Sequence, residues 1–348
     1  MRAAVLHGRE DVRVEAVPIP ALEPGEILLR TSAALTCGTD AKVFRRGYHA
    51  RMLHPPALFG HELAGVVEEV GPGVERVRRG ARVVVANSAP CGVCVSCAEG
   101  RETLCDDLLF WNGAYAEFAR VPARIVQKNL LPLAPQIGFR EAAMVEPLAC
   151  VVRGIEASRI RPGQTVAVIG TGPIGLMLLV LARLGGAHTI LAGRNDGRRG
   201  KARDLGADEV IDASEVADLA DALREHSPGG RGPDVVIEAA GLAETSEAAL
   251  RAVRKGGLVN LFAGCPAGAR VAFDAQRLHY EELTVTSTFH HTPESFRKAY
   301  RLIEEAKVDP SSFITAEAAL EAVPEVLRSM ADGGDGLKTA ILPWGAGG

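Results

Sequence analysis

The first half of the chain alternates short apolar runs with turns rich in proline and glycine. Runs of this length, broken by Pro24-Gly25 and Gly71-Pro72-Gly73, predict short strands joined by tight turns. We expect a compact, barrel-like β domain whose loops carry function. Its predicted strands include residues 3–6, 26–31, 65–70 and 82–85.

From residue 140 to residue 156, apolar side chains recur at helical spacing, and we expect this helix to cross between two domains. After Pro162-Gly163 the pattern changes, because strand-like and helix-like runs now alternate. Six such strands, from 165–169 to 283–287, predict a doubly wound parallel sheet. The tail from about residue 288 has two helical runs and a final strand near 338–342, and these could fold back on the first domain.

Composition narrows the class of protein. A chain of 348 residues with 47% apolar and 24% charged residues suits a soluble protein of two domains. A net charge of −4 and the lack of a basic run disfavour nucleic acid as a partner. The N-terminus has no signal-peptide core, and the most apolar stretch, 173–184, is too short to span a bilayer. We therefore expect a soluble, cytoplasmic protein with no membrane partner.

Four cysteines follow C-x2-C-x2-C-x7-C spacing within residues 91–105, namely Cys91, Cys94, Cys97 and Cys105. Thiolates this close predict one tetrahedral Zn²⁺, and four protein ligands leave no open position for chemistry. We interpret this lobe as a structural zinc site in a reducing compartment. Ordinary buried cysteines are the alternative, but core thiols do not recur at every third residue.

A glycine fingerprint follows an apolar strand and opens an apolar helix: Gly170-Thr171-Gly172-Pro173-Ile174-Gly175. In this context Gly170 permits a tight turn, Gly172 lets the backbone approach a pyrophosphate, and Gly175 allows close contact between helix and strand. The pyrophosphate would lie at the helix N-terminus. The alternative is a glycine-rich turn without a ligand.

The end of the next strand bears on the choice of cofactor. An NAD-type site places a carboxylate there, whereas this chain has Gly193 and Arg194, with Arg198 and Arg199 just beyond. Arg194 could clamp a 2′-phosphate, so we favour NADP(H) over NAD(H). The alternative is that the arginines are solvated and that Asp196 supplies the acid.

Candidate ligands of a second metal stand in glycine-rich loops and at the predicted crossing: Cys37, His61, Glu62 and Glu146. A thiolate with an imidazole suits Zn²⁺, and the charges of Cys37 and Glu62 balance the ion. If Glu146 also bound directly, the centre would become net negative. We therefore expect Glu146 to hold a water or to exchange with it. Without the other candidate ligands, His61 would be interpreted as an ordinary loop histidine. Asp40 is expected to anchor its loop by hydrogen bonds.

The stretch Gly60-His61-Glu62-x2-Gly65-x5-Gly71-x2-Val74 resembles the zinc signature of the medium-chain, alcohol-dehydrogenase-like oxidoreductases. The cysteine lobe, the glycine fingerprint and the ending 338–341 also match that family's order. Glu62 and Glu146 make the chain look most like the sorbitol and threonine dehydrogenase branch. The resemblance implies a GroES-like catalytic domain (1–150), a Rossmann domain (151–287) and a return of the chain to the first domain (288–348). It also implies an active site in the cleft between the two domains, and assembly as a homodimer or homotetramer.

The resemblance further implies two zinc ions, one catalytic and one structural, and hydride transfer between a secondary alcohol and NADP(H). A polyol, a sugar-like alcohol or a hydroxy amino acid is the expected substrate. Thr39 would relay the hydroxyl proton. Lys42 stands where the family often has a histidine that continues this relay. Two alternatives follow: Lys42 holds a ribose hydroxyl of the cofactor, or solvent takes the proton directly. An NAD-linked enzyme and a non-catalytic dinucleotide-binding protein are the alternatives.

Other side chains stand in segments that could line the substrate cleft, although packing or surface roles explain each equally well: Phe44, Tyr48, His49, Trp111 and His290. His291 follows the last predicted sheet strand together with His290, where the chain of the resembled family returns towards the nicotinamide. Both histidines, like Lys42 and His49, are therefore candidates to face a hydroxylated substrate. Lys338 matches the family's basic C-terminal position and is expected to reach the cofactor or to brace the domains.

Overall fold

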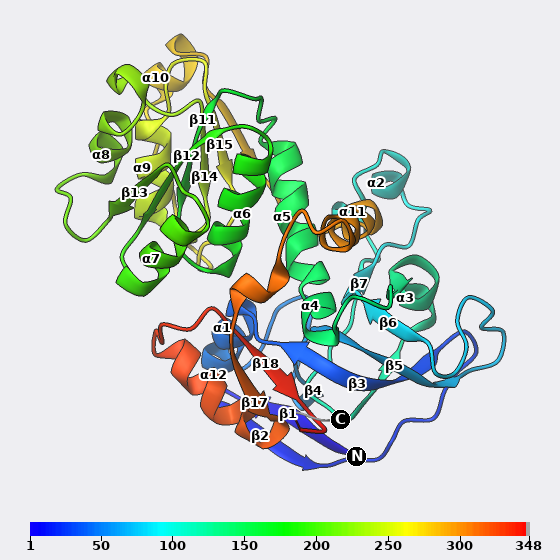
Figure 1. Ribbon diagram of the computed structural model, residues 1–348. Helices are drawn as coiled ribbons and strands as arrows, with labels where there is room; N and C mark the ends of the chain where they lie inside the picture. The colour runs from blue at the N-terminus through cyan, green and yellow to red at the C-terminus, as the bar shows by residue number, and fades with distance from the viewer. Residues whose placement is uncertain (346–348) are drawn as a thin grey trace. The chain divides into compact units, whose positions relative to one another are not determined.

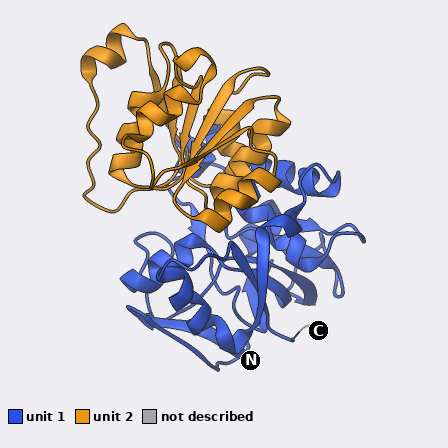
Figure 2. Cartoon of the chain, turned by 60° about the vertical axis from the view of Figure 1, so that its left-hand side comes forward, with its two compact units in different colours: residues 1–149, 291–348 blue, residues 150–290 orange. Residues whose placement is uncertain are grey.

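The computed structural model describes residues 1–345, and the chain forms two compact units (Figure 2). Unit 1 comprises residues 1–149 and the chain from His291 onward, and unit 2 comprises residues 150–290. The predicted crossing helix is two helices, α4 (Phe139–Ala143) and α5 (Val145–Ala157). Pro147 lies in the first turn of α5, where its missing N–H costs little, so a new helix begins there.

A seven-stranded sheet of order β10-β6-β5-β3-β18-β17, with β9 paired to β3, positions the candidate site in unit 1. Leu35 at the end of β3 pairs with Glu62 at the start of β5, and Ala340 of β18 pairs with Leu35. Residues just beyond these three strand ends therefore meet. The bounds are β3 (Ile27–Leu35), β5 (Glu62–Val70), β6 (Arg82–Val85), β9 (Phe118–Val121), β10 (Leu130–Pro132), β17 (Ile314–Ala319) and β18 (Lys338–Leu342).

The rest of unit 1 surrounds this sheet with a three-stranded sheet, β2-β1-β4, and a two-stranded one, β7-β8. Apolar residues of β1, β3, β5 and β6 form its core. The strands are β1 (Arg2–Gly8), β2 (Asp11–Ala16), β4 (Ala57–Leu58), β7 (Ser88–Ala89) and β8 (Leu109–Phe110). The remaining helices are α1 (Gly38–Arg46), α2 (Val95–Ala98), η1 (Glu102–Leu104), α3 (Ala123–Lys128), α11 (Pro293–Glu304), η3 (Pro310–Phe313), η4 (Leu320–Ala322) and α12 (Val323–Ala331).

Unit 2 is a parallel six-stranded sheet of order β13-β12-β11-β14-β15-β16 with helices along it (Figure 1). The predicted α/β class, with a doubly wound parallel sheet in the second part of the chain, is confirmed. The strands are β11 (Thr165–Ile169), β12 (His188–Gly193), β13 (Glu209–Asp212), β14 (Val235–Glu238), β15 (Leu258–Leu261) and β16 (Thr284–Ser287). The helices are α6 (Pro173–Leu184), α7 (Asp196–Asp204), α8 (Leu219–Glu225), η2 (Pro228–Gly230), α9 (Ala243–Ala252) and α10 (Ala275–Tyr280).

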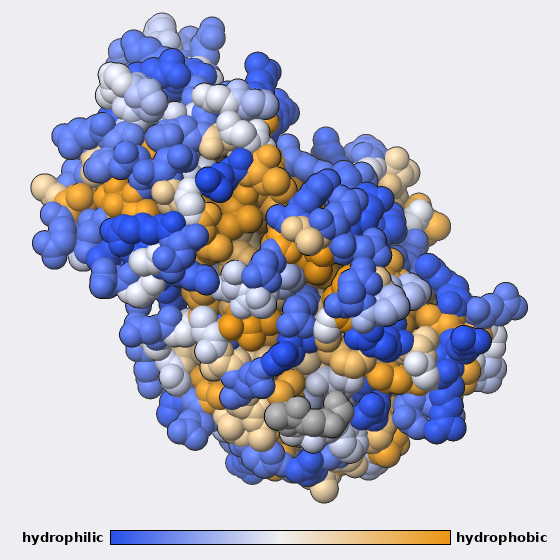
Figure 3. Space-filling view, viewed as in Figure 1, coloured by the Kyte–Doolittle hydropathy of each residue, from blue (hydrophilic) through white to orange (hydrophobic). Residues whose placement is uncertain are grey.

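Hydrophilic residues cover most of the face drawn in Figure 3, and apolar residues form separate patches among them. Within residues 1–345, no helix is both long enough and apolar enough to cross a membrane.

Candidate active site

Cys37 caps helix α1 directly after β3 ends. Its Sγ accepts a hydrogen bond from the Thr39 N–H at 3.5 Å, and the Asp40 carboxylate accepts one from the Cys37 N–H at 3.1 Å. This reciprocal cap satisfies donors at the helix N-terminus, where the helix dipole also favours a thiolate. Local sequence therefore sets the direction of the sulfur.

His61 and Glu62 meet Cys37 from the start of β5. Gly60 has φ +85°, and a Cβ there would lie 2.7 Å from the Tyr115 ring, so glycine is required before His61. Ligand atoms of Cys37, His61 and Glu62 all lie within 4.8 Å of one another. His61 is 4% exposed and Glu62 is fully buried. A thiolate, an imidazole and a carboxylate are donors that zinc takes, so this group fits the predicted metal.

Asp40 orients the histidine of this group. Its Oδ1 lies 3.0 Å from His61 Nδ1, and both side chains are buried. A hydrogen bond at Nδ1 leaves the Nε2 lone pair for a metal. Burial alone lowers the pKa of His61, but the charges of Asp40 and Cys37 raise it well above its ordinary value. Protons and metal therefore compete for this imidazole.

Lys338 forms a buried ion pair with Glu62. Its Nζ donates to both carboxylate oxygens, at 2.6 and 2.8 Å, and to the Thr36 carbonyl at 2.9 Å. Burial lowers the pKa of Lys338, but the charges of Glu62 and Cys37 raise it above its ordinary value, so the ammonium stays charged. The sequence suggests that Lys338 reaches the cofactor or braces the domains. In the structure its three hydrogen bonds go to Thr36 and Glu62 of unit 1.

Glu146, in the first turn of α5, is also buried, and burial raises its pKa to about 7. His291 lies beside it, with Nε2 3.5 Å from Glu146 Oε1 and 3.1 Å from Asn87 Oδ1. Burial, and then the charge of His61, lower the pKa of His291 to about 3, so this imidazole is neutral. His291, a candidate substrate contact from its position in the sequence, thus lies beside a predicted zinc-site residue.

Three further predictions fall on helix α1. Thr39 is half-buried in its first turn, and its backbone N–H donates to Cys37 Sγ. Lys42 is exposed one turn later. Phe44 is 2% exposed and packs in the core of unit 1, so its prediction as a wall of the substrate pocket is corrected. Helical spacing places it on the buried face of α1.

The other pocket candidates have varied surroundings. Tyr48 is 52% exposed. The Nδ1 of His49 accepts two backbone hydrogen bonds within its own turn, so this histidine anchors a loop. Trp111 is half-buried against the core of unit 1. His290 belongs to unit 2, where it has φ +61° and a tilted ring contact with Phe289.

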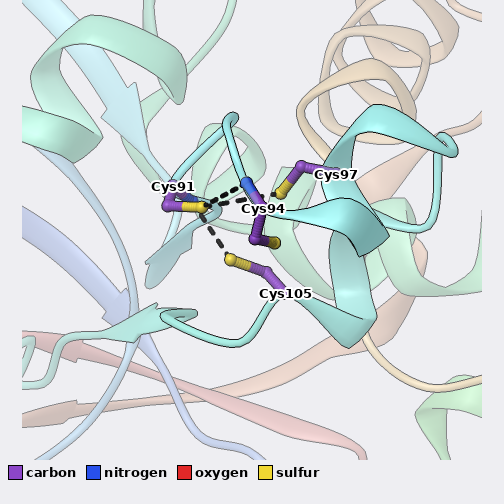
Figure 4. Close-up of side chains that lie close together, drawn as sticks. All are labelled: Cys91, Cys94, Cys97 and Cys105. Carbon is purple, nitrogen blue, oxygen red and sulfur yellow. Dashed lines mark hydrogen bonds between the residues drawn. The ribbon is translucent and has the colours of Figure 1, made fainter.

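The four cysteines of the predicted structural site converge, with sulfurs within 4.8 Å of one another (Figure 4). Backbone N–H groups of Val93 and Cys94 donate to Cys91 Sγ and lower its pKa to about 6, whereas burial raises the pKa of Cys97 to about 12. Four thiolates so close repel one another unless a cation lies among them. This arrangement fits a tetrahedral zinc site.

In unit 2, the glycine fingerprint forms the turn between β11 and α6. Gly170 has φ +120°, and a Cβ on Gly175 would lie 1.9 Å from the Gly170 carbonyl oxygen, so both positions require glycine. A Cβ on Gly172 would meet nothing within 4 Å. Gly172 caps α6 without a side-chain bond, and Pro173 begins the helix. Its N-terminal N–H groups are arranged as an anion site requires.

Packing explains why no carboxylate ends strand β12. A Cβ on Gly193 would lie 2.3 Å from Cγ2 of Thr171, which is itself buried in the fingerprint turn. A larger residue would displace Thr171. The packing of Thr171 in the fingerprint turn therefore requires glycine at position 193 and excludes a carboxylate there.

The arginines after β12 differ in their surroundings. Arg194 is exposed. Arg199 is buried, and it forms ion pairs with Asp212 at 2.5 Å and Asp196 at 3.1 Å, so it has a structural role. Arg198 is half-buried in the first turn of α7. The Asp196 side chain is 91% exposed and pairs with Arg199.

Two family models match the chain: an alcohol dehydrogenase GroES-like domain over residues 23–132 and a zinc-binding dehydrogenase domain over residues 173–305. An L-threonine 3-dehydrogenase of Pyrococcus abyssi (strain GE5 / Orsay) is 33% identical over 328 residues, which cover 90% of this chain and 89% of that relative. This chain belongs to the zinc-dependent medium-chain dehydrogenases.

Other members of the dehydrogenase family support the same placement. Sorbitol dehydrogenase of Bacillus subtilis (strain 168) is 28% identical over 354 residues, covering 99% of this chain and 97% of that one. A Sinorhizobium meliloti 1021 structure of zinc-binding dehydrogenase type, bound to NADP, has a TM-score of 0.89 at 31% identity, covering 98% and 99% of the two chains. The predicted family, with its sorbitol and threonine dehydrogenase branch, is confirmed.

The supporting residues of the site were largely missed from sequence. Asp40 anchors its loop as expected, but it also holds His61, and Lys338 holds Glu62. Tyr115, whose hydroxyl lies 2.5 Å from Asp40, carried no signal in the sequence. For Asp40 a signal existed, since its spacing from Cys37 is that of a capping box.

Proposed function

We propose that this dehydrogenase transfers hydride between NADP(H) and a secondary alcohol that is a polyol, a sugar-like alcohol or a hydroxy amino acid. The observation that carries the proposal is the buried group of Cys37, His61 and Glu62, whose ligand atoms lie within 4.8 Å of one another. Sorbitol and L-threonine 3-dehydrogenases among its relatives support the substrate classes.

Cys37, His61 and Glu62 would hold the catalytic zinc, with Glu146 as a further ligand or as the residue that holds a water. Bound there, zinc supplies a Lewis acid that lowers the pKa of an alcohol hydroxyl. Lys338 changes the charge balance expected from the ligands alone. Its ammonium offsets one of the three negative charges of Cys37, Glu62 and Glu146, so a centre that includes Glu146 is less negative than its ligands alone would make it.

The protein's own groups would manage the proton. Thr39 lies beside Cys37 and is half-buried, which supports a role in which its hydroxyl accepts a proton from the substrate and passes it on. Lys42 is exposed on the same helix, which supports transfer from Thr39 to solvent. Glu146, with its pKa raised to about 7 by burial, can hold a proton at its carboxylate near neutral pH.

NADP(H) is the proposed cofactor because Gly193 leaves no acid at the end of β12 and Arg194 is exposed beside it. Thr171 fills the space where a side chain at position 193 would begin. A guanidinium suits a 2′-phosphate, which it can bind bidentately. The NADP bound in the Sinorhizobium meliloti structure supports this choice.

Titration calorimetry of zinc-loaded protein with NAD⁺ and NADP⁺, at one ionic strength, tests the proposal. We expect NADP⁺ to bind more tightly, and Arg194→Glu to weaken its binding by roughly 2–5 kcal/mol while leaving NAD⁺ little changed. Arg203→Glu is the matched control, because Arg203 is exposed at the far end of α7, the helix that follows Arg194.

A preference for NAD⁺, or an unchanged NADP⁺ affinity in Arg194→Glu, would favour the NAD-linked alternative. Turnover is then measured over a panel of polyols and amino alcohols with the preferred cofactor. Cofactor binding without turnover of any of them would favour a non-catalytic dinucleotide-binding protein.

A further inference from the structure

Tyr115 is fully buried in unit 1, and its hydroxyl reaches the site from behind Asp40. The Oη lies 2.5 Å from Asp40 Oδ2 and 3.1 Å from the Leu35 carbonyl oxygen. A phenol has one proton, and the shorter contact, to an ionised carboxylate, is the stronger bond. The hydroxyl therefore donates to Asp40.

The two oxygens of Asp40 have separate partners. Oδ2 accepts from Tyr115 and, at 3.1 Å, from the Cys37 N–H. Oδ1 faces His61 Nδ1 at 3.0 Å. Asp40 is 1% exposed, so no solvent competes for these oxygens. Two donors on Oδ2 fix the plane of the carboxylate, and this leaves Oδ1 directed at the histidine.

The Tyr115 ring is held independently of its hydroxyl. It packs where a Cβ of residue 60 would be, and it makes an edge-to-face contact with Phe59 at 6.0 Å between ring centroids. Removing the hydroxyl alone should therefore leave the ring in place.

We propose that Tyr115 is a positioning residue of the metal centre: through Asp40, its hydroxyl holds His61 with Nε2 directed at the metal. This inference rests on the zinc site of the proposed function. Groups that orient a metal-bound histidine generally change metal affinity by about 10–100-fold when removed. The Tyr115 hydroxyl is one hydrogen bond further from the metal than Asp40, and it acts through the fixed carboxylate of Asp40.

The test is Tyr115→Phe in the full-length, zinc-loaded protein. We expect release of one of the two zinc ions to a chelator to become about 10-fold faster or more. In the Co²⁺-substituted protein, the d–d absorption of the buried site should shift. Tyr300→Phe is the control, because Tyr300 is also buried in unit 1 and its hydroxyl accepts a hydrogen bond at 2.9 Å from the Ala134 N–H, which is not part of the candidate metal centre.

Asp40→Asn provides a second variant. If Tyr115 acts through Asp40, adding Tyr115→Phe to Asp40→Asn should change zinc release little further, because the shared contact is already altered. Fully additive effects, or wild-type release and an unshifted Co²⁺ spectrum in Tyr115→Phe, would overturn the inference. Both readouts measure metal binding and not turnover. A wild-type protein that bound zinc but lacked dehydrogenase activity would therefore count against the proposed function and not against this inference.

Discussion

The cysteine lobe and the buried group around His61 both bring metal-type ligands within 4.8 Å, but they do so by different means. The lobe draws all four ligands from one continuous segment, residues 91–105. The buried group draws its ligands from the ends of β3 and β5, and its supporting lysine from β18. One site is local in the chain and the other depends on the register of a sheet.

Their surroundings differ as well. The lobe sulfurs are mostly half-buried and accept hydrogen bonds from nearby backbone N–H groups. In the buried group, side chains from distant segments hold the ligands, as Asp40 holds His61 and Lys338 holds Glu62. A local site needs little besides its metal, whereas the buried site requires the folded sheet. Three variants test this contrast.

The largest effect is expected at the lobe. Cys97→Ser should remove one zinc ion and destabilise the lobe by a sizeable part of the about 10–16 kcal/mol that structural zinc contributes in zinc-finger peptides. Hydrogen exchange should rise within residues 91–105 and little elsewhere. Cys265→Ser, at a half-buried cysteine of unit 2, is the control. A variant that keeps both zinc ions would contradict the structural assignment.

A smaller but global effect is expected at the buried site. Lys338→Met leaves the fully buried Glu62 carboxylate without its partner, which should lower the free energy of unfolding by about 3–5 kcal/mol in metal-free protein. Adding Glu62→Gln should restore most of the loss, because it removes the unpaired charge. Chemical unfolding curves of the two variants measure both effects. Equal stability of single and double variants would show that the ion pair is not what holds this site.

The smallest effect is expected at Asp234 in unit 2, a buried carboxylate held by protein donors alone. Thr165 N–H and Arg254 donate to it at 2.7 and 2.6 Å. Burial raises the pKa of Asp234, but these bonds lower it below its ordinary value. Asp234→Asn should cost about 1–3 kcal/mol at neutral pH.

The sign of the pH dependence follows from that lowered pKa. Asp234 contributes its full stability above the pKa of an unfolded aspartate, about 4, and loses it as pH falls through the lower folded value. The gap between wild type and Asp234→Asn in chemical unfolding should therefore narrow below pH 4. A gap that widens in acid would contradict this account.

Local patterns predicted much of the fold. Alternating runs after residue 162 predicted the six parallel strands, and periodic side chains predicted helices α6 to α9 but not α10. The crossing helix proved to be two, since a proline in the first turn favours a new start. Strand β17 (Ile314–Ala319) was missed because its alanine-rich sequence lacks the β-branched runs that mark strands.

The sequence by itself determined the four cysteines of the lobe, the fingerprint glycines and the candidate ligands Cys37, His61 and Glu62, because each pattern is short and few other structures require the same spacing. Only the tertiary structure decided which distant residues support them. Lys338 meets Glu62, and Tyr115 meets Asp40, because β18, β3 and β5 pair in one register and the chain around residue 115 packs behind them. Such contacts join residues far apart in the chain, so no local spacing encodes them.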